Sequence, residues 1–185
     1  MPKTPIRQSI LNRRRALAAD MCLALSLQAQ ERLLASAEFD SAACVALYSP
    51  IANEVFTEEI FSAALRLGKR IVYPRVRGSQ LEFCEVTDRQ ALSPGMLGVL
   101  EPQEGRPVAP ERIDLVVVPG VAFDLFGHRL GYGKGFYDRT FGARTRGLLA
   151  GFAFELQVVE QLPKEDHDVR LDLLITEARV IHFHQ

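Results

Sequence analysis

The sequence predicts a single α/β domain, with a mainly parallel open sheet flanked by helices. Three observations support this fold class. Segments of strand length alternate with segments of helical periodicity along the chain, the pattern of an α/β layer structure. Residues 115–118, Leu-Val-Val-Val, are continuously apolar, as expected of a central strand covered on both faces. The chain has 185 residues, which is within the size of one domain, so we expect residues 1–185 to fold as one unit.

The helices are predicted from apolar spacing and from residues that begin or end helices. Thr4 and Pro5 suit a helix start, because threonine caps free N–H groups and proline lacks the N–H that would stay unpaired there. Asp20 is expected to start a second helix, and Gly68 to stop a third. The expected helical segments are about residues 4–17, 20–37, 56–67 and 156–161, with another beginning near Lys134.

The strands are predicted from short apolar or alternating runs. Pro74 is expected to end one of them, and the prolines within residues 90–112 predict a long irregular connection. The strand over residues 115–118 is expected to lead directly into a glycine-rich loop at the carboxyl edge of the sheet, where ligands bind in Rossmann-like layers. The expected strands are residues 43–48, 71–73, 81–86, 115–118, 148–152 and 171–175.

Charge and composition limit the function classes. The net charge of −1 argues against bulk binding of nucleic acid. Residues 1–15 are basic, which is typical of a solvated helix face or sometimes of an RNA-binding arm, but no aromatic residue interrupts the run to stack on bases. Residues 13–29 superficially resemble a secretory signal, yet Asp20 interrupts the apolar part, so we expect an uncleaved, cytoplasmic protein. No apolar run approaches the roughly 20 residues of a membrane span.

The cysteines and histidines predict no metal centre. Cys22, Cys44 and Cys84 are widely spaced and form no C-x-x-C pair, so we expect reduced and mostly buried thiols. His182 and His184 alternate near the end of the chain, but two ligands without a third make a poor site.

Residues 129–139, Arg-Leu-Gly-Tyr-Gly-Lys-Gly-Phe-Tyr-Asp-Arg, are the most informative segment. Glycines at alternate positions let backbone N–H groups converge on an anion, and Lys134 adds a mobile positive charge. The segment fits neither the P-loop pattern, since Gly135 follows the lysine, nor the dinucleotide pattern G-x-G-x-x-G. It therefore predicts an anion-binding loop of another kind, with a glycine-rich turn and a solvated lysine as the alternative.

A wider set of motifs resembles a known family. Residues 119–124, Gly127 and residues 129–139 together look like the signature of the 5-formyltetrahydrofolate cyclo-ligases, also called methenyltetrahydrofolate synthetases. The resemblance extends over nearly the whole chain. Its other parts are Lys3 and Arg7, residues 49–54, residues 95–98 with Glu101 and Pro102, and residues 162–168.

The resemblance implies an enzyme that uses ATP and Mg²⁺ to convert 5-formyltetrahydrofolate to 5,10-methenyltetrahydrofolate, releasing ADP and phosphate. It implies catalytic contacts to phosphate from Lys134 and Arg129, and Mg²⁺ ligation by Asp138 and Asp168. The implied ATP-binding residues are Lys3, Thr4, Pro5, Ile6, Arg7, Arg129, Leu130, Gly131, Tyr132, Gly133, Lys134, Gly135, Phe136 and Tyr137. The implied folate-binding residues are Ser49, Glu54, Tyr132, Gly133, Lys134, Gly135 and Phe136.

Each implied role has an ordinary structural alternative. Lys3 and Arg7 are otherwise solvated charges, since positive charge opposes the dipole at a helix start. Glu54 is otherwise a helix-start acid, Asp168 a loop cap, and Asp124 a turn residue or a supporting partner of the site.

Other functions remain open at the level of sequence. Phe136 stands where the family often has tyrosine, which bears on folate affinity but not on the phosphate chemistry. The alternatives are an ATP- and Mg²⁺-dependent enzyme acting on another pterin or amide, and a nucleotide-binding regulator without turnover. We expect small-molecule partners, neither nucleic acid nor membrane, and a monomer or weak homo-oligomer.

Overall fold

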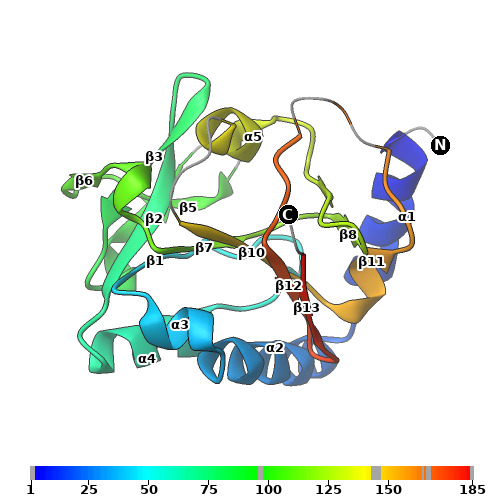
Figure 1. The fold of residues 1–185 in the computed structure, drawn as a ribbon, viewed down its shortest axis with the longest axis horizontal. Helices are drawn as coiled ribbons and strands as arrows, with labels where there is room; N and C mark the ends of the chain where they lie inside the picture. The colour runs from blue at the N-terminus through cyan, green and yellow to red at the C-terminus, as the bar shows by residue number, and fades with distance from the viewer. Residues whose placement is uncertain (1–2, 96–97, 143–146, 164, 166–167, 184–185) are drawn as a thin grey trace.

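A computed structural model describes residues 3–95, 98–142, 147–163, 165 and 168–183. At its centre is an eight-stranded sheet with the strand order β13-β12-β10-β7-β1-β2-β3-β6 (Figure 1). Strands β12, β10, β7, β1 and β2 run parallel to one another, while β13, β3 and β6 pair antiparallel at the two edges. The predicted fold class, an α/β protein with a mainly parallel sheet flanked by helices, is confirmed.

The strands fall into the main sheet and two small ones. The main sheet contains β1 (Cys44–Ala46), β2 (Arg70–Arg77), β3 (Gln80–Glu85), β6 (Pro107–Val108), β7 (Leu115–Val118), β10 (Leu148–Phe152), β12 (Leu173–Ile175) and β13 (Val180–His182). The small sheets are β11-β8-β9, from β8 (Ala122–Asp124), β9 (Arg129–Leu130) and β11 (Val158–Val159), and β4-β5, from β4 (Leu92–Pro94) and β5 (Leu100–Pro102).

Helices cover both faces of the main sheet (Figure 1). Helices α2, α3 and α4 lie along one face, α5 lies on the other, and α1 lies at one end beside β8 and β11. No helix in the described part of the chain is both long and apolar enough to cross a membrane. The α-helices are α1 (Lys3–Arg15), α2 (Ala19–Leu34), α3 (Ala37–Ser41), α4 (Glu58–Arg66) and α5 (Phe136–Phe141), and the 3₁₀ turns are η1 (Arg89–Ala91), η3 (Pro110–Arg112) and η4 (Glu155–Gln157).

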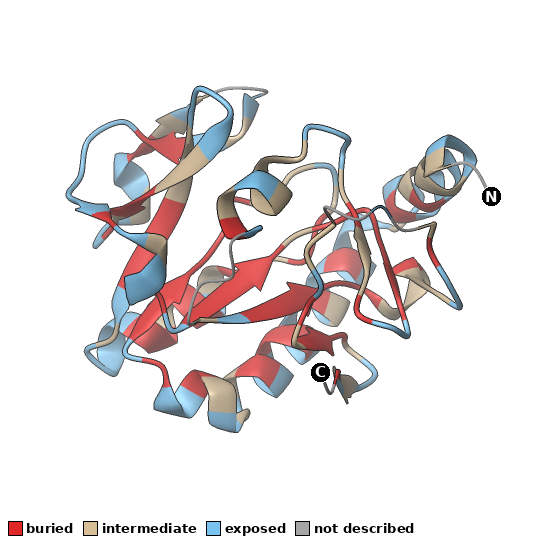
Figure 2. Cartoon of the chain, turned by 45° about the horizontal axis from the view of Figure 1, so that its top comes forward, coloured by how far each residue is buried: buried red, intermediate tan, exposed pale blue. Residues whose placement is uncertain are grey.

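The apolar core is divided by the sheet into two layers. Along β1, Val45 faces the layer under α2 and α4, whereas Cys44 and Ala46 face the layer under α5, because successive side chains of a strand point to opposite faces. Figure 2 shows the central strands buried along their whole length. The three cysteines are buried free thiols, as expected.

Several boundaries differ from the predictions. β2 continues through Pro74, because its pairing with β1 ends at Val72 and no N–H is required on that side. The second helix ends at Leu34, and a separate helix, α3, follows it. The first helix already includes Lys3, so Thr4 is not its N-cap.

Two connections are more ordered than expected. Residues 90–112 contain β4, β5 and β6 rather than an entirely irregular segment. The β8–β9 hairpin lies between β7 and the glycine-rich loop, so β7 does not enter that loop directly. The helix predicted over residues 156–161 is also absent, and the chain forms the turn η4 and the strand β11 there instead.

The strand order creates a crevice at the carboxyl ends of β1 and β7. From β1 the chain continues to its neighbour β2, whereas β7 lies on the other side of β1 and the chain continues from it to β10. At such a switch point the connections leave in opposite directions and open a space between them. The segment before Glu54 follows β1, and Pro119 follows β7, so both segments border this space.

Candidate active site

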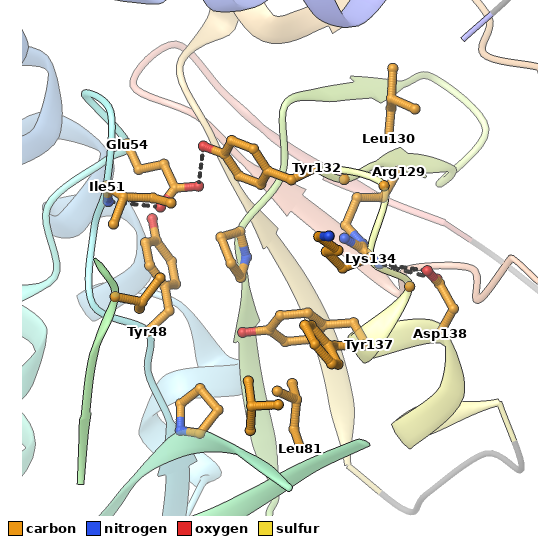
Figure 3. A pocket seen from close by; sticks show the side chains of 18 of the residues that line it. Tyr48, Ile51, Glu54, Leu81, Arg129, Leu130, Tyr132, Lys134, Tyr137 and Asp138 are labelled. Carbon is orange, nitrogen blue, oxygen red and sulfur yellow. Dashed lines mark hydrogen bonds and ion pairs between the residues drawn. The ribbon is translucent and has the colours of Figure 1, made fainter. Parts of the chain in front are cut away.

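A cavity of about 650 Å³ lies at this switch point. Figure 3 shows Glu54 and Tyr48 on one side of it, Lys134 and Asp138 on the other, and the ring of Tyr132 between them. Polar and charged residues therefore lie at both ends. Its further lining includes the apolar side chains of Ile51, Pro74, Val76, Leu81, Val99, Phe136 and Tyr137.

The glycine-rich loop connects β9 to α5 and forms one wall. Gly133 and Gly135 have φ angles of +94° and +63°, a left-handed conformation that residues with a side chain rarely adopt. Gly131 lies against the Arg129 guanidinium, where an added Cβ would be only 2.8 Å from Nη1. The glycines are therefore required by the backbone path and by the close approach of Arg129.

Lys134 extends from this loop as an exposed cation. No described residue accepts a hydrogen bond from its ammonium group or forms an ion pair with it, while its carbonyl accepts a 2.6 Å hydrogen bond from Arg139. Arg139 also donates to the carbonyl of Ser79 at 2.6 Å, which ties the loop to the β2–β3 hairpin. The lysine charge is thus presented on an anchored backbone and remains available to a ligand.

Helix α1 brings two further cations to the same end. Lys3 Nζ lies 3.1 Å from both Asp168 Oδ2 and Glu165 Oε1, and Arg7 Nε donates to the Gly131 carbonyl at 3.0 Å. Burial opposes the charged ammonium of Lys3, but its hydrogen bonds to Glu165 and Asp168 raise its pKa. Neither residue is a freely solvated charge, so the solvated alternative is wrong.

The rest of the α1 segment has other surroundings. Among the described residues of α1, Lys3 and Arg7 line the cavity. Thr4 and Pro5 are exposed, and Ile6 packs against the small apolar cluster around Ile10.

Arg129 and Asp138 form an ion pair beside the loop. Arg129 Nη2 lies 3.1 and 3.2 Å from the two oxygens of Asp138, and its guanidinium carbon lies 5.3 Å from the centre of the Tyr137 ring. The N–H of Val169 donates to Asp138 Oδ1 at 3.4 Å, so the segment carrying Asp168 lies against Asp138. The two predicted metal ligands therefore border the same end of the cavity.

These two carboxylates fit a cation that brings other ligands with it. Asp168 Oδ2 also accepts the Glu165 N–H at 2.8 Å, so it does act as a loop cap while facing the cavity. Within the described ranges, no three histidine, cysteine or acidic side chains cluster as a metal site. Mg²⁺ commonly takes one or two carboxylates and fills its remaining positions with phosphate oxygens and water. The donor set thus suits Mg²⁺ bound to a polyphosphate.

Glu54 lies at the opposite end and is 4% exposed. Its carboxylate accepts hydrogen bonds from the Tyr132 hydroxyl at 3.0 Å and from the Ile51 N–H at 3.1 Å. Burial raises the pKa of Glu54 to about 7, although nearby Arg14 and these two hydrogen bonds favour the charged form. Helix α4 begins at Glu58, four residues later, so Glu54 is not the helix-start acid of the alternative interpretation.

The turn before Glu54 is strained. Ala52 and Asn53 have φ angles of +48° and +56°, values that cost conformational energy in residues other than glycine. With the turn in this conformation, the Glu54 carboxylate lies against Tyr132 instead of in solvent. Ser49 is also buried, and its hydroxyl donates to the Leu100 carbonyl at 2.8 Å, which fixes the cavity wall.

Three further observations complete the placement of the predicted residues. Leu130 is buried, and Figure 3 shows its side chain pointing away from the cavity. Asp124 is fully buried and accepts hydrogen bonds from the N–H groups of Phe126, His128 and Leu162, so it is a turn residue. His184 and His167 lie outside the described residues.

Sequence reasoning missed two groups at this site. Glu101 is 8% exposed and lines the cavity. Arg14 is fully buried, whereas the basic run was expected to be a solvated face. The sequence could have indicated that Arg14 faces inward, because Arg7, Ile10 and Arg14 follow the spacing of one helical face.

The fold and the cavity together define the class, an α/β protein with a cavity lined by basic and acidic residues at the switch point of its sheet. The model of the 5-formyltetrahydrofolate cyclo-ligase family matches residues 1–177. The chain belongs to this family.

Individual relatives agree with the family match. The chain is 33% identical over 178 residues to the 5-formyltetrahydrofolate cyclo-ligase of Escherichia coli K12, with 92% of this chain and 98% of that protein covered. The solved 5,10-methenyltetrahydrofolate synthetase of Aquifex aeolicus has a TM-score of 0.89 and 38% identity, over 100% of this chain and 94% of that one. The enzyme of the same name from Mycoplasma pneumoniae has a TM-score of 0.80 and 31% identity, over 96% and 99% of the two chains.

Proposed function

We propose that this protein is an ATP-dependent 5-formyltetrahydrofolate cyclo-ligase that forms 5,10-methenyltetrahydrofolate, ADP and phosphate. The observation that carries the proposal is one cavity with cations and three carboxylates, those of Asp138, Glu165 and Asp168, at one end and the buried carboxylate of Glu54 at the other. A reaction between a polyphosphate and a pterin requires both kinds of surroundings within one space.

The basic end suits the triphosphate of ATP. Lys3, Arg7, Arg129 and Lys134 all border it, and the glycine-rich backbone adds N–H groups. Asp138 and Asp168 would hold Mg²⁺ carried by the nucleotide, and that cation would offset the charge of the phosphates.

The other end suits a pterin. The ring system is flat and carries N–H donors, which an acceptor such as the Glu54 carboxylate binds well when it is charged. Its faces can pack on the apolar side chains of the middle of the cavity, such as Ile51, Leu81 and Phe136. Ser49 and Tyr132 border the same space, Ser49 as part of the wall and Tyr132 as the partner of Glu54.

The formyl oxygen of the substrate is a poor leaving group, so the reaction first converts it to a phosphate. An N-formyl oxygen attacks the γ-phosphorus of ATP, the bond to the bridging oxygen breaks, and ADP departs. The folate N10 attacks the activated formyl carbon and loses its proton to water, and the resulting adduct expels phosphate, which takes the former formyl oxygen. The protein aligns the two substrates and stabilises the charge that spreads over the transferred phosphoryl group. Lys134 and Arg129 are the residues to which we give that task.

Related proposals concern assembly and extent. We propose that residues 1–185 act as a single domain and that the protein works as a monomer or weak homo-oligomer in the cytoplasm, with small molecules as its partners. The support is that one cavity gathers residues from α1, both halves of the sheet and the segment around Asp168, so the predicted site residues come from one chain.

The direct test is turnover. Purified protein mixed with ATP, Mg²⁺ and 5-formyltetrahydrofolate should develop the near-ultraviolet absorbance of methenyltetrahydrofolate and release phosphate in equal amount. Leaving out ATP should abolish both signals. If a known cyclo-ligase works in the same buffer while this protein gives no product, the proposed function is wrong.

Glu54→Gln should separate the two substrates. The amide keeps the size of the side chain but loses the charge that makes its hydrogen bonds to the pterin strong, a loss of roughly 1.5–3 kcal/mol. We expect kcat/KM for the folate to fall by about 10- to 100-fold, while ATP affinity measured without folate changes little.

Two outcomes would contradict this role for Glu54. Equal losses for both ligands would indicate that the side chain only supports the turn before α4. Wild-type kinetics would mean that the carboxylate does not touch the pterin. Glu59→Gln, a change at an exposed acid in α4, is the matched control.

A further inference from the structure

Arg14 connects three separate segments around the cavity. Its side chain is fully buried near the end of α1. Nε donates to the Ala52 carbonyl at 2.8 Å, Nη1 to the Gly120 carbonyl at 3.1 Å, and Nη2 to the Tyr132 hydroxyl. These partners lie in the turn before Glu54, in the segment after β7 and in the glycine-rich loop. One guanidinium group thus joins the turn before Glu54 to the glycine-rich loop.

The direction of these hydrogen bonds follows from the chemistry of the groups. A guanidinium group can only donate, so the Tyr132 oxygen must accept from Arg14. The hydroxyl proton of Tyr132 is therefore free to be donated, and Glu54 Oε1 accepts it at an oxygen–oxygen distance of 3.0 Å. Partial burial and the Glu54 charge raise the pKa of Tyr132, so the phenol keeps that proton. The chain of donors therefore runs from Arg14 through Tyr132 to Glu54.

This arrangement leaves Glu54 with acceptor capacity for a ligand. Its two oxygens receive the Tyr132 hydroxyl and the Ile51 N–H, whereas an ionised carboxylate offers about four acceptor positions. Glu54 itself borders the cavity. A fixed Tyr132 hydroxyl therefore orients the carboxylate and leaves its other positions available to donors in the cavity.

Packing alone is a poor explanation for a buried guanidinium. Removing an arginine from water is costly, and an apolar side chain of similar volume often serves stability as well or better. The neighbouring Arg13 and Arg15 are exposed, so α1 carries a charge inward at only this member of the three. The guanidinium carbon also lies 5.8 Å from the centre of the Tyr132 ring, which adds a cation–π contact.

We propose that Arg14 is a positioning residue for the pterin site, because its buried guanidinium holds the Tyr132 hydroxyl toward the Glu54 carboxylate and ties the glycine-rich loop to the Glu54 turn. The inference rests on the proposed function and adds a residue to it. Arg14 borders no substrate itself and acts through Tyr132 and Glu54.

The experiment compares Arg14→Lys, Arg14→Met, Tyr132→Phe and the pair Arg14→Met/Tyr132→Phe with the wild type, and uses Arg15→Met as the matched control. Calorimetry measures 5-formyltetrahydrofolate binding without ATP, and separately ATP binding without folate. Arg14→Met and Tyr132→Phe should each weaken folate binding by about tenfold. The pair should be little worse than either single change, since both break the same chain of donors. ATP binding should fall less than folate binding in these variants, because the backbone of the glycine-rich loop and Lys134 remain, and the control should stay near wild type.

The pH profile supplies a signature that a purely structural role lacks. Among the residues that the structure describes, the titratable groups facing Glu54 are Arg14 and the phenols of Tyr48, Tyr132 and Tyr137, and of these Arg14 is the cation that favours ionised Glu54. Without it the neutral carboxyl persists to higher pH. The acidic limb of kcat/KM for folate should therefore move upward in Arg14→Met and move less in Arg14→Lys, which keeps the charge.

Different results would overturn the positioning role of Arg14 and the proposed function. Equal losses for both ligands, additive effects in the pair, or an unmoved acidic limb would overturn the positioning role. If Arg14→Met does not fold, Tyr132→Phe decides, because wild-type folate affinity in that variant overturns the inference. A wild-type protein that neither binds nor converts 5-formyltetrahydrofolate overturns the proposed function, and the folate role of Arg14 with it. Normal wild-type activity with unaffected variants overturns the inference alone.

Discussion

Replacing Asp138 with asparagine should lower kcat by at least about 100-fold. An amide is a poor ligand for a hard dication, so the variant should hold nucleotide-bound Mg²⁺ weakly. The Mg²⁺ concentration that gives half the maximal rate should rise as well. Steady-state rates across a Mg²⁺ titration measure both quantities.

Asp138 also pairs with Arg129, and the test must separate the two roles. Binding of Mn²⁺ in the presence of ATP, followed by electron paramagnetic resonance, reports the metal without turnover and should weaken in Asp138→Asn. Asp40→Asn, a change at an exposed acid in α3, is the matched control and should behave like the wild type. Near-normal activity at saturating Mg²⁺ would reject a metal role for Asp138.

Replacing Arg129 with glutamine should lower kcat by about 100- to 1,000-fold, the effect of losing one well-placed group that stabilises transition-state charge. The guanidinium is nearly buried between Asp138, the Tyr137 ring and the glycine loop, so its position is defined before a ligand binds. An enzyme gains most from charges that need no rearrangement during the reaction. Single-turnover kinetics should therefore show a slower chemical step.

Two control variants define what Arg129 supplies. Arg129→Lys keeps the charge but loses the planar guanidinium, whose Nη2 contacts both oxygens of Asp138 and whose face lies near the Tyr137 ring, so it should recover only part of the rate. Arg112→Gln changes an exposed arginine in the turn η3 and should leave the rate intact. A normal rate in Arg129→Gln, with the melting temperature alone reduced, would mean that the residue serves only to pair Asp138.

Glu54 illustrates why site residues depart from the rules of stability. A carboxyl with a pKa near 7 costs stability at higher pH, because the folded protein must hold a buried charge that the unfolded chain holds in water. The sign follows from the raised pKa: stability falls as the pH rises from the ordinary carboxyl pKa toward 7. The strained residues before it, Ala52 and Asn53, add to that cost. The proposed binding of a pterin to Glu54 would offset both costs.

Much of the fold follows from local sequence. The continuous apolar run in β7 predicted a buried central strand, because such a strand has no polar face to present. The prediction that Pro74 ends a strand was wrong, because a proline breaks a strand only where its missing N–H is needed for pairing. Whether a neighbouring strand reaches that position depends on the register of the sheet.

The sequence alone determined the backbone freedom and the charge of the glycine-rich loop, since the positive φ angles of Gly133 and Gly135 and the charge of Lys134 depend on the residues themselves. Only the tertiary structure decided which of the three consecutive arginines is buried. Arg14 bonds to partners 106 and 118 positions away, Gly120 and Tyr132. Burial is set by how α1 docks against these distant segments, and identical neighbours in sequence receive different surroundings because a helix turns each side chain in a different direction.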